Sequence, residues 1–239
     1  MSQTNSASKI DVNSTAHERY VFKPKIGSSH HWALKHLANI TLGQRVLDIG
    51  PGSGFAGKEL LSRGVQDLYA VEPDPSTAQE LSPVYKKIAP NLEQLDQDNF
   101  DVAILMDVLE HMSEPEAYLE NLLKRIKPGG QLIISVPNIA HWSVRFALLF
   151  GFFEYQERGP LDRTHLQFFS RRRFAKLVQL KNLVCAIETS YSIEPIELLL
   201  PTALSENKFF DQISQIRSKF AALLPGLMAY QFLALVKKK

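Results

Sequence analysis

The sequence contains a single cysteine, Cys185, among 239 residues. One thiol cannot form an internal disulfide, and sparse cysteine is typical of proteins from a reducing compartment. Residues 1–18 contain no apolar segment of the kind that a secretory signal needs. The longest apolar run, residues 146–155, is too short to span a bilayer. We therefore expect a cytoplasmic protein without stable membrane insertion.

Neither sign of charge is in large excess, because 27 Lys and Arg residues stand against 25 Asp and Glu residues, for a net charge of +2. Nucleic-acid-binding domains usually carry a marked basic patch. Apart from the C-terminal lysines, the one dense basic run is residues 171–173, and such runs are usually solvated faces. We expect no nucleic-acid partner, and the sequence leaves the oligomeric state open.

The hydrophobic content of 45% is that of an ordinary globular protein, and the chain is long enough to bury a sizeable core. Residues 1–19 are polar and rich in Ser, Asn and Thr, which predicts a disordered tail. The remaining residues, 20–239, are expected to form one domain.

Apolar strand-like segments alternate with helical patterns between residues 45 and 138. Ser113 is expected to cap the last of these helices, which should end at Gly129 and Gly130. This alternation predicts an α/β fold with a doubly wound, mostly parallel sheet. Two later strand-like segments, 182–192 and 230–238, flank a helical stretch. The intervening regions 139–168 and 192–226 are expected to be substrate-side or lid insertions.

The segment "RVLDIGPGSGFAGKELLSRG", residues 45–64, places three glycines between a strand and a helix. Gly50, Gly52 and Gly54 can adopt positive φ and admit a ligand close to the backbone. The helix that follows offers unpaired N–H groups at its start. Because no Gly-Lys-Ser/Thr closes the turn, a phosphate-binding P-loop is excluded.

Two acidic residues give information about the ligand. Asp48 precedes the first glycine by two residues, where it would repel a pyrophosphate but attract an ammonium or sulfonium group. Glu72 ends the second strand, where its carboxylate could accept hydrogen bonds from ribose hydroxyls. Because dinucleotide folds also use an acid at this position, Glu72 indicates adenosine without distinguishing the two ligands, and it is Asp48 that favours S-adenosylmethionine over a dinucleotide.

Four segments in order, "VLDIGPGSG", "VEPD", "FDVAILMDVLEHM" and "KPGGQLIISVPN", resemble the successive motifs of class I S-adenosylmethionine-dependent methyltransferases. The resemblance covers residues 45–138. It implies S-adenosyl-L-methionine as cofactor and a Rossmann-like seven-stranded sheet with an antiparallel last strand. It also implies that Gly50 and Gly52 line the methionine moiety, that Glu72 holds the ribose and that Asp107 approaches the methyl donor. The adenine-contacting acid stays unassigned, with Asp96 as the nearest candidate.

His111, just past the fourth strand, is the first candidate for a general base. With Asp107 and Glu110 it forms a D-x-x-E-H cluster, which resembles the E-x-x-E-H arrangement of quinone-ring O-methyltransferases, where these positions can bind a divalent metal. Since the cofactor pocket needs Asp107, our predicted site contains no metal.

The segment "GPLDRTHLQFFS" resembles one found in bacterial methyltransferases of the surface-polysaccharide and small-metabolite type. It supplies His165 as a second candidate catalytic residue, whereas Asp162 is expected to hold the loop.

The predicted function is transfer of a methyl group to an oxygen or nitrogen of a small molecule, glycan or lipid intermediate. A NAD(P)-dependent oxidoreductase is an alternative, disfavoured by Asp48, Pro51 and the "DVLEHM" motif. A second alternative is a non-catalytic module that binds S-adenosylmethionine and acts through a protein partner.

Overall fold

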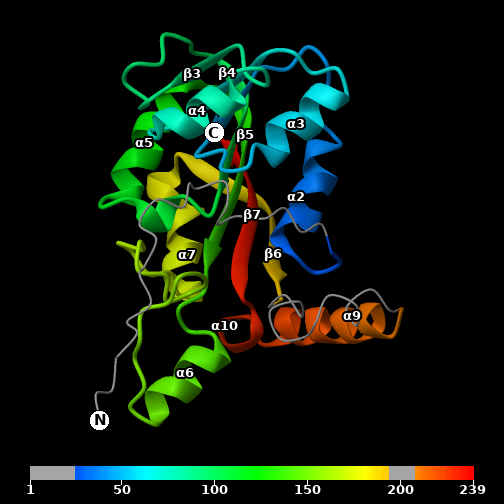
Figure 1. Ribbon diagram of the computed structural model, residues 1–239, viewed down its shortest axis with the longest axis vertical. Helices are drawn as coiled ribbons and strands as arrows, with labels where there is room; N and C mark the ends of the chain where they lie inside the picture. The colour runs from blue at the N-terminus through cyan, green and yellow to red at the C-terminus, as the bar shows by residue number, and fades with distance from the viewer. Residues whose placement is uncertain (1–24, 194–207) are drawn as a thin grey trace, which may run out of the picture.

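The computed structural model describes residues 25–193 and 208–239 (Figure 1). The expected disordered tail, residues 1–19, lies outside them. The strands are β1 (Val46–Ile49), β2 (Leu68–Val71), β3 (Lys87–Ala89), β4 (Phe100–Met106), β5 (Ile126–Pro137), β6 (Val184–Ser192) and β7 (Gln231–Lys238). The helices are α2 (Ser29–Leu37), α3 (Phe55–Ser62), α4 (Pro75–Leu81), α5 (Pro115–Arg125), α6 (Trp142–Leu149), α7 (Arg171–Leu177), α9 (Lys208–Leu223) and α10 (Pro225–Met228), with short 3₁₀ helices η1 (Leu109–His111) and η2 (Leu180–Asn182).

The seven strands form one sheet in the order β3-β2-β1-β4-β5-β7-β6. The pairs from β3 across to β5 are parallel, whereas β7 runs antiparallel to both of its neighbours. This arrangement confirms the predicted doubly wound sheet with a reversed last strand. The chain leaves β1 for β2 on one side and returns to β4 on the other, so the strand order reverses at β1, where open α/β sheets bind their ligands.

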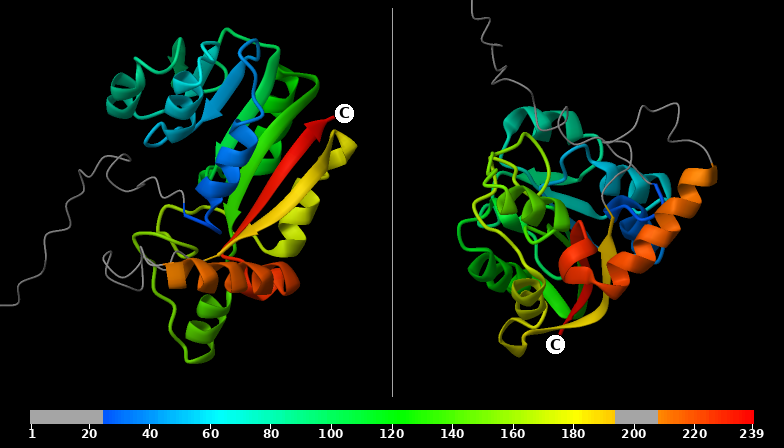
Figure 2. Two further views of the ribbon diagram at one scale, coloured as in Figure 1. Left: turned by 90° about the vertical axis from the view of Figure 1, so that its right-hand side faces the viewer. Right: turned by 90° about the horizontal axis from the view of Figure 1, so that it is seen from below.

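Two apolar clusters cover the two faces of the sheet. Helices α2, α3 and α4 pack on one face through side chains such as Leu37, Leu60 and Leu81. Helices α5 and α7 pack on the other through Leu122 and Phe174 (Figure 2). Strands β1 and β2 are buried along their whole length, as expected of central parallel strands covered on both faces.

The structure corrects the predicted limits of one helix. Ser113 does not cap α5, because Glu114 occupies the N-cap position, and the carbonyl of Ser113 accepts a hydrogen bond from Gln167 instead. Glu116, the expected partner in the capping box, pairs with Arg173. The helix ends at Arg125, and β5 already begins at Ile126, so the two glycines at 129 and 130 lie within the strand.

The segments beyond β5 gather at the end of the sheet to which β5 and β6 point. Helix α6 projects from this end, and α9 and α10 lie across it before β7 returns into the sheet (Figure 1). Within the described residues, the helices are each too short or too polar to cross a membrane.

Candidate active site

A cavity of about 860 Å³ opens at the carboxyl ends of β1, β2 and β4. This volume lies within the range of small-molecule and cofactor sites. Its walls come from the turn after β1, the ends of β2 and β3, and the segment after β4. They include Asp48, Gly50, Gly52, Glu72, Asp107, Val108, His111, Met112, Tyr118 and Thr164.

The glycine turn borders the cavity with two residues in the left-handed region. Gly50 has φ of 60° and Gly52 has φ of 53°. A Cβ atom on Gly50 would lie 3.0 Å from Cγ2 of Val108, whereas a Cβ on Gly52 would meet none of the described residues within 4 Å. Since Gly52 lines the cavity, its bare backbone leaves room there for a ligand.

Gly54 has a different role and is not among the residues that line the cavity. It is the N-cap of α3, with φ of 72°. A Cβ on Gly54 would lie 2.4 Å from Cδ2 of Leu81, which is buried. This glycine is therefore required by the packing of α3 against α4.

Asp48 lies near the end of β1 and is buried at the floor of the cavity. Its Oδ2 atom accepts a hydrogen bond of 2.6 Å from the hydroxyl of Tyr85. Burial raises the pKa of the Asp48 carboxyl to about 7, and the nearby charge of Glu72 contributes in the same direction. A cationic ligand would reverse this effect by favouring the charged carboxylate.

Glu72 follows β2 and is also buried against the cavity. Its Oε1 atom accepts a hydrogen bond of 2.9 Å from the backbone N–H of Asp74, which fixes the orientation of the carboxylate. Burial raises the pKa of this group too. The position is consistent with the predicted contact to a ribose.

Asp107 follows β4 in the left-handed region, with φ of 54°. Its Oδ1 atom accepts a hydrogen bond of 2.7 Å from Ser135 of β5, and its Oδ2 atom accepts one of 2.5 Å from Gln231 of β7. Burial raises the pKa of Asp107. Ser135 and Gln231 were not found by sequence reasoning, because nothing local marks two residues that meet only when the strands pair.

His111 ends η1 and faces the cavity. Its Nδ1 atom lies 3.2 Å from the backbone carbonyl oxygen of Thr164. Because a carbonyl only accepts hydrogen bonds, this contact assigns the proton to Nδ1 and leaves the lone pair on Nε2. The structure thus holds the imidazole in the tautomer that a general base requires.

His165 does not line the cavity but packs against His111, with ring centroids 4.9 Å apart. Its Nε2 atom lies 4.0 Å from Oε1 of Glu110, a side chain only 1% exposed. Both carboxyl oxygens of Glu110 and Nδ1 of His165 lack a hydrogen-bond partner among the described residues. Burial and the charge of Asp107 raise the pKa of Glu110 well above its usual range.

Glu110, His111 and His165 could hold a metal ion, since one ligand atom from each lies within 4.8 Å of the others. Carboxylate and imidazole suit several divalent ions, and the unpartnered Glu110 oxygens fit such a role. The arrangement differs from the D-x-x-E-H cluster of the sequence, because both oxygens of Asp107 are occupied by hydrogen bonds and His165 takes its place.

Two further candidates lie outside the cavity lining. Asp96 is exposed and pairs with Lys87 at 2.6 Å. The residues just beyond β3 that line the cavity are instead Pro90, Asn91, Leu92 and Glu93. Asp162 accepts hydrogen bonds from the N–H and hydroxyl of Thr164, at 2.8 and 2.6 Å, so it holds the loop as expected.

A doubly wound sheet with a reversed last strand, and a cavity bordered by a glycine turn and a buried acid after β2, define the class I methyltransferase fold. The family model described as a methyltransferase domain matches residues 22–186, more than half of the chain. The chain therefore belongs to this family, the class I S-adenosylmethionine-dependent methyltransferases, and its cofactor is S-adenosylmethionine.

The curated relatives include a ubiquinone biosynthesis O-methyltransferase of Maricaulis maris, 31% identical over 182 residues, which are 72% of this chain and 66% of that protein. A protein of the same name from Coxiella burnetii is 32% identical over 108 residues, which are 41% of this chain and 46% of that protein. The chain thus spans 66% or less of the length of these relatives.

Solved structures share the fold at low identity. A SAM-dependent methyltransferase from Archaeoglobus fulgidus has a TM-score of 0.57 at 17% identity, covering 89% of this chain and 95% of that one. Phosphoethanolamine N-methyltransferase 2 of Haemonchus contortus, in complex with S-adenosyl-L-methionine, has a TM-score of 0.54 at 17% identity, covering 86% of this chain and 51% of that one.

Proposed function

We propose that this protein transfers the methyl group of S-adenosylmethionine to the oxygen of a ring hydroxyl on a small molecule or lipid intermediate, with His111 as general base. The observation that carries the proposal is the contact between His111 Nδ1 and the carbonyl of Thr164, which leaves Nε2 of this cavity-lining residue able to accept a proton. The curated relatives, which are named as O-methyltransferases, support oxygen as the acceptor atom.

The residues that line the cavity suit the charges and hydroxyl groups of the cofactor. Bound S-adenosylmethionine supplies a methyl group on a positively charged sulfur. The carboxylates of Asp48 and Asp107 offer negative charge to its amine and sulfonium groups, and Glu72 accepts hydrogen bonds from the ribose. Gly50 and Gly52 admit the methionine part close to the backbone.

His111 then acts on the acceptor. Nε2 accepts the hydroxyl proton as the oxygen bonds to the methyl carbon, while the electron pair of the breaking carbon–sulfur bond stays on sulfur. A ring hydroxyl suits this base because a phenol has a pKa of about 10, closer to that of histidine than an alkyl alcohol. Val108, Met112 and Tyr118 provide an apolar wall that would pack on a ring and exclude water.

The cluster of Glu110, His111 and His165 supports a second candidate for the same step. A divalent ion held there would polarise the acceptor oxygen and lower its pKa. His111 would then be a ligand instead of a base, and activity would depend on the metal.

The proposal is tested with labelled methyl donor and two acceptor panels, one of phenols and catechols and one of sugars and amines. We expect methylation in the first panel, and loss of about 10²- to 10⁴-fold in His111→Gln, the usual contribution of a general base. His31→Gln, on α2, is the matched control. A chelator that abolishes activity, with rescue by Mg²⁺ or Mn²⁺, would favour the metal candidate.

Calorimetric titration with S-adenosylhomocysteine measures cofactor binding separately from turnover. Binding of S-adenosylhomocysteine without turnover in either panel would support the non-catalytic module. Turnover that is unchanged in His111→Gln would refute the assignment of the base.

A further inference from the structure

Helix α6 presents a stripe of exposed apolar side chains. The stripe consists of Trp142, Phe146, Leu149 and Phe150, which recur at the spacing that places residues on one helical face. The segment that follows continues the exposure with Phe152, Phe153 and Tyr155. Within α6 only Val144 is buried, so the helix contributes little to the core.

Helix α9 carries a second stripe with the same spacing. Ile216, Phe220 and Leu223 are exposed, at positions that again fall on one face, and Leu224, the residue after the helix, is exposed as well. Two elements separated in the sequence thus leave an apolar face uncovered. Exposed apolar patches of this kind mark contact sites rather than ordinary surface.

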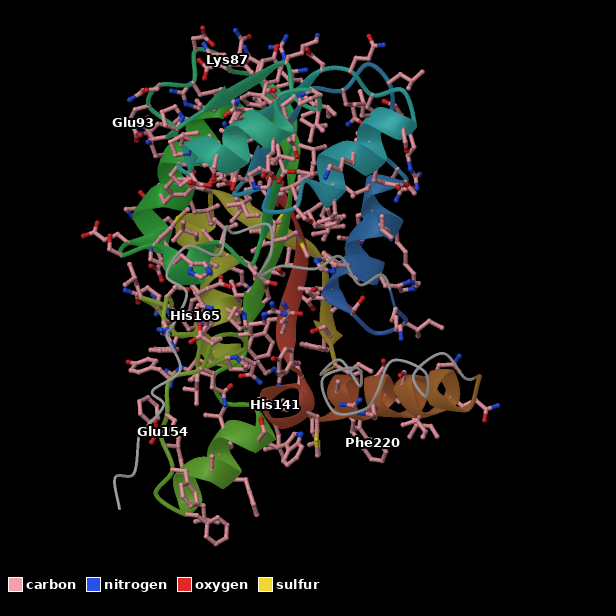
Figure 3. All side chains as sticks on the ribbon, in the orientation of Figure 1. Lys87, Glu93, His141, Glu154, His165 and Phe220 are labelled. Atoms are coloured by element: carbon pink, nitrogen blue, oxygen red, sulfur yellow. The ribbon has the colours of Figure 1, made fainter. Side chains whose placement is uncertain are left out.

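The two stripes lie at the same end of the molecule. Arg145 of α6 donates a hydrogen bond to the carbonyl oxygen of Gly226 in α10, and α10 packs against α9. Phe220 points from α9 away from the sheet, toward the side on which α6 projects (Figure 3). We call the surface formed by the two stripes and residues 152–155 the apolar end.

The composition of the apolar end fits a lipid bilayer. Between residues 142 and 155 the exposed apolar side chains are phenylalanine and leucine, with Trp142 at the start and Tyr155 at the end of this stretch, and these last two residue types favour the membrane interface. Among the described side chains of the two helices, the charged ones are Arg145, Arg217 and Lys219, all basic, and Glu154 is the acidic residue of the 152–155 segment. A cationic helix pair with exposed aromatic side chains is complementary to anionic headgroups.

We propose that the apolar end binds the surface of an anionic membrane, with α6 and α9 lying in the interfacial region and the rest of the domain in water. Membrane binding by the apolar end does not depend on the proposed reaction. Entry of the methyl acceptor from the membrane, in contrast, rests on the proposed function. The loop after residue 155 carries Thr164 to the cavity wall, so the site lies near the end that would meet the bilayer, and an apolar acceptor could enter from the membrane.

The test is cosedimentation of the protein with phosphatidylcholine vesicles, with and without phosphatidylglycerol, in the absence of cofactor and acceptor. We expect binding to vesicles that contain phosphatidylglycerol, weakened by salt because the headgroup attraction is screened. Trp142 is a natural reporter, since the other tryptophan, Trp32, is buried and donates a hydrogen bond to Glu188. Its emission should shift to shorter wavelength on binding, and Trp142→Phe should remove that shift while retaining cosedimentation.

Matched substitutions locate the contact. Leu149→Ser on α6 and Leu223→Ser on α9 change side chains that are 78% and 73% exposed, and Leu42→Ser changes one that is 66% exposed in the turn before β1. We expect each of the first two to weaken vesicle binding about five- to tenfold, because an interface buries part of a leucine side chain. Their combination should multiply the losses, and Leu42→Ser should leave binding unchanged.

Three results would overturn the proposal. One is failure of the wild-type protein to bind either kind of vesicle. Another is equal weakening by Leu42→Ser, which would mean that the contact is not specific to the apolar end. The third is a concentration-dependent dimer, seen by sedimentation and lost in Leu149→Ser, without vesicle binding. S-adenosylhomocysteine binding, measured in the same variants, should stay unchanged, so failure of this proposal remains distinct from failure of the proposed reaction.

Discussion

Asp48→Asn should stabilise the cofactor-free protein at alkaline pH while weakening cofactor binding. Burial raises the pKa of Asp48 from 3.8 to about 7, so the folded protein keeps the proton on this carboxyl over a range in which the unfolded chain releases it. The stability that Asp48 contributes therefore falls as pH rises from about 4 to about 7. Asparagine cannot ionise, and its Oδ1 can still accept the hydrogen bond of Tyr85.

The size of the effect follows from the pKa shift. Three units correspond to about 4 kcal/mol at a pH above both values. Because Asp48 borders a cavity that can hold solvent, we expect about half of this, about 2 kcal/mol. For a protein of this length, that corresponds to an increase in Tm of about 4–8 °C.

The assay is thermal unfolding of the wild type and Asp48→Asn at pH values from about 4 to about 8, which include both the unfolded and the folded pKa of Asp48. The gain in Tm should be largest above the folded pKa and should shrink toward the acidic end, where the unfolded chain also keeps the proton on this carboxyl. Tyr85→Phe removes the hydrogen bond that favours the carboxylate, so it should move the window to higher pH. A gain that does not vary with pH, or a loss at every pH, would refute the assignment of a buried, protonated Asp48.

The remaining predictions concern the cofactor and its turn. Glu72→Ala should raise the Kd for S-adenosylhomocysteine about ten- to over a hundredfold, because hydrogen bonds to a charged group contribute about 1.5–3 kcal/mol, and a change below about twofold in calorimetry would remove Glu72 from the pocket. Gly52→Ala should keep the fold but weaken binding about tenfold or more, since its Cβ would project into the cavity. Gly54→Ala should instead lower stability by about 2–3 kcal/mol in thermal unfolding, because its Cβ would collide with buried Leu81. Equal losses of stability in the two glycine variants would contradict their different roles.

The fold and half of the site could be predicted because their signals are local. The strands at Val46–Ile49 and Phe100–Met106 are apolar on both faces, and the glycines at 50, 52 and 54 mark the turn between β1 and α3. Asp48 and Glu72 could be placed because each lies at or near the end of a strand, and parallel strands bring such ends to one edge. The same reasoning misplaced the cap at Ser113, since a capping motif in the sequence shows neither that the helix begins one residue later, after Glu114, nor that the Ser113 carbonyl accepts a hydrogen bond from Gln167.

Long-range pairings could not be predicted. Gln231 reaches Asp107 because β7 enters the sheet antiparallel to β5 in a register that pairs Ser135 with Leu233. His165 meets Glu110 because the loop before α7 donates two backbone N–H groups to the Glu110 carbonyl. No periodicity or motif in the sequence marks the contact of Gln231 with Asp107 or that of His165 with Glu110. The residues that orient the candidate catalytic groups can therefore be identified only from the folded structure.

Several acidic side chains lie close together in and behind the cavity, an arrangement that lowers the stability of the folded protein. Asp48, Glu72 and Asp107 line the cavity, Glu110 lies just behind, and burial raises the pKa of all four. Buried carboxyl groups with raised pKa values cost stability as the pH rises, and a protein retains such a cluster where a ligand compensates for it. A ligand with both an ammonium and a sulfonium charge would do so, whereas a pyrophosphate would add to the repulsion. The electrostatics of the cavity thus support S-adenosylmethionine over a dinucleotide, independently of the sequence motifs.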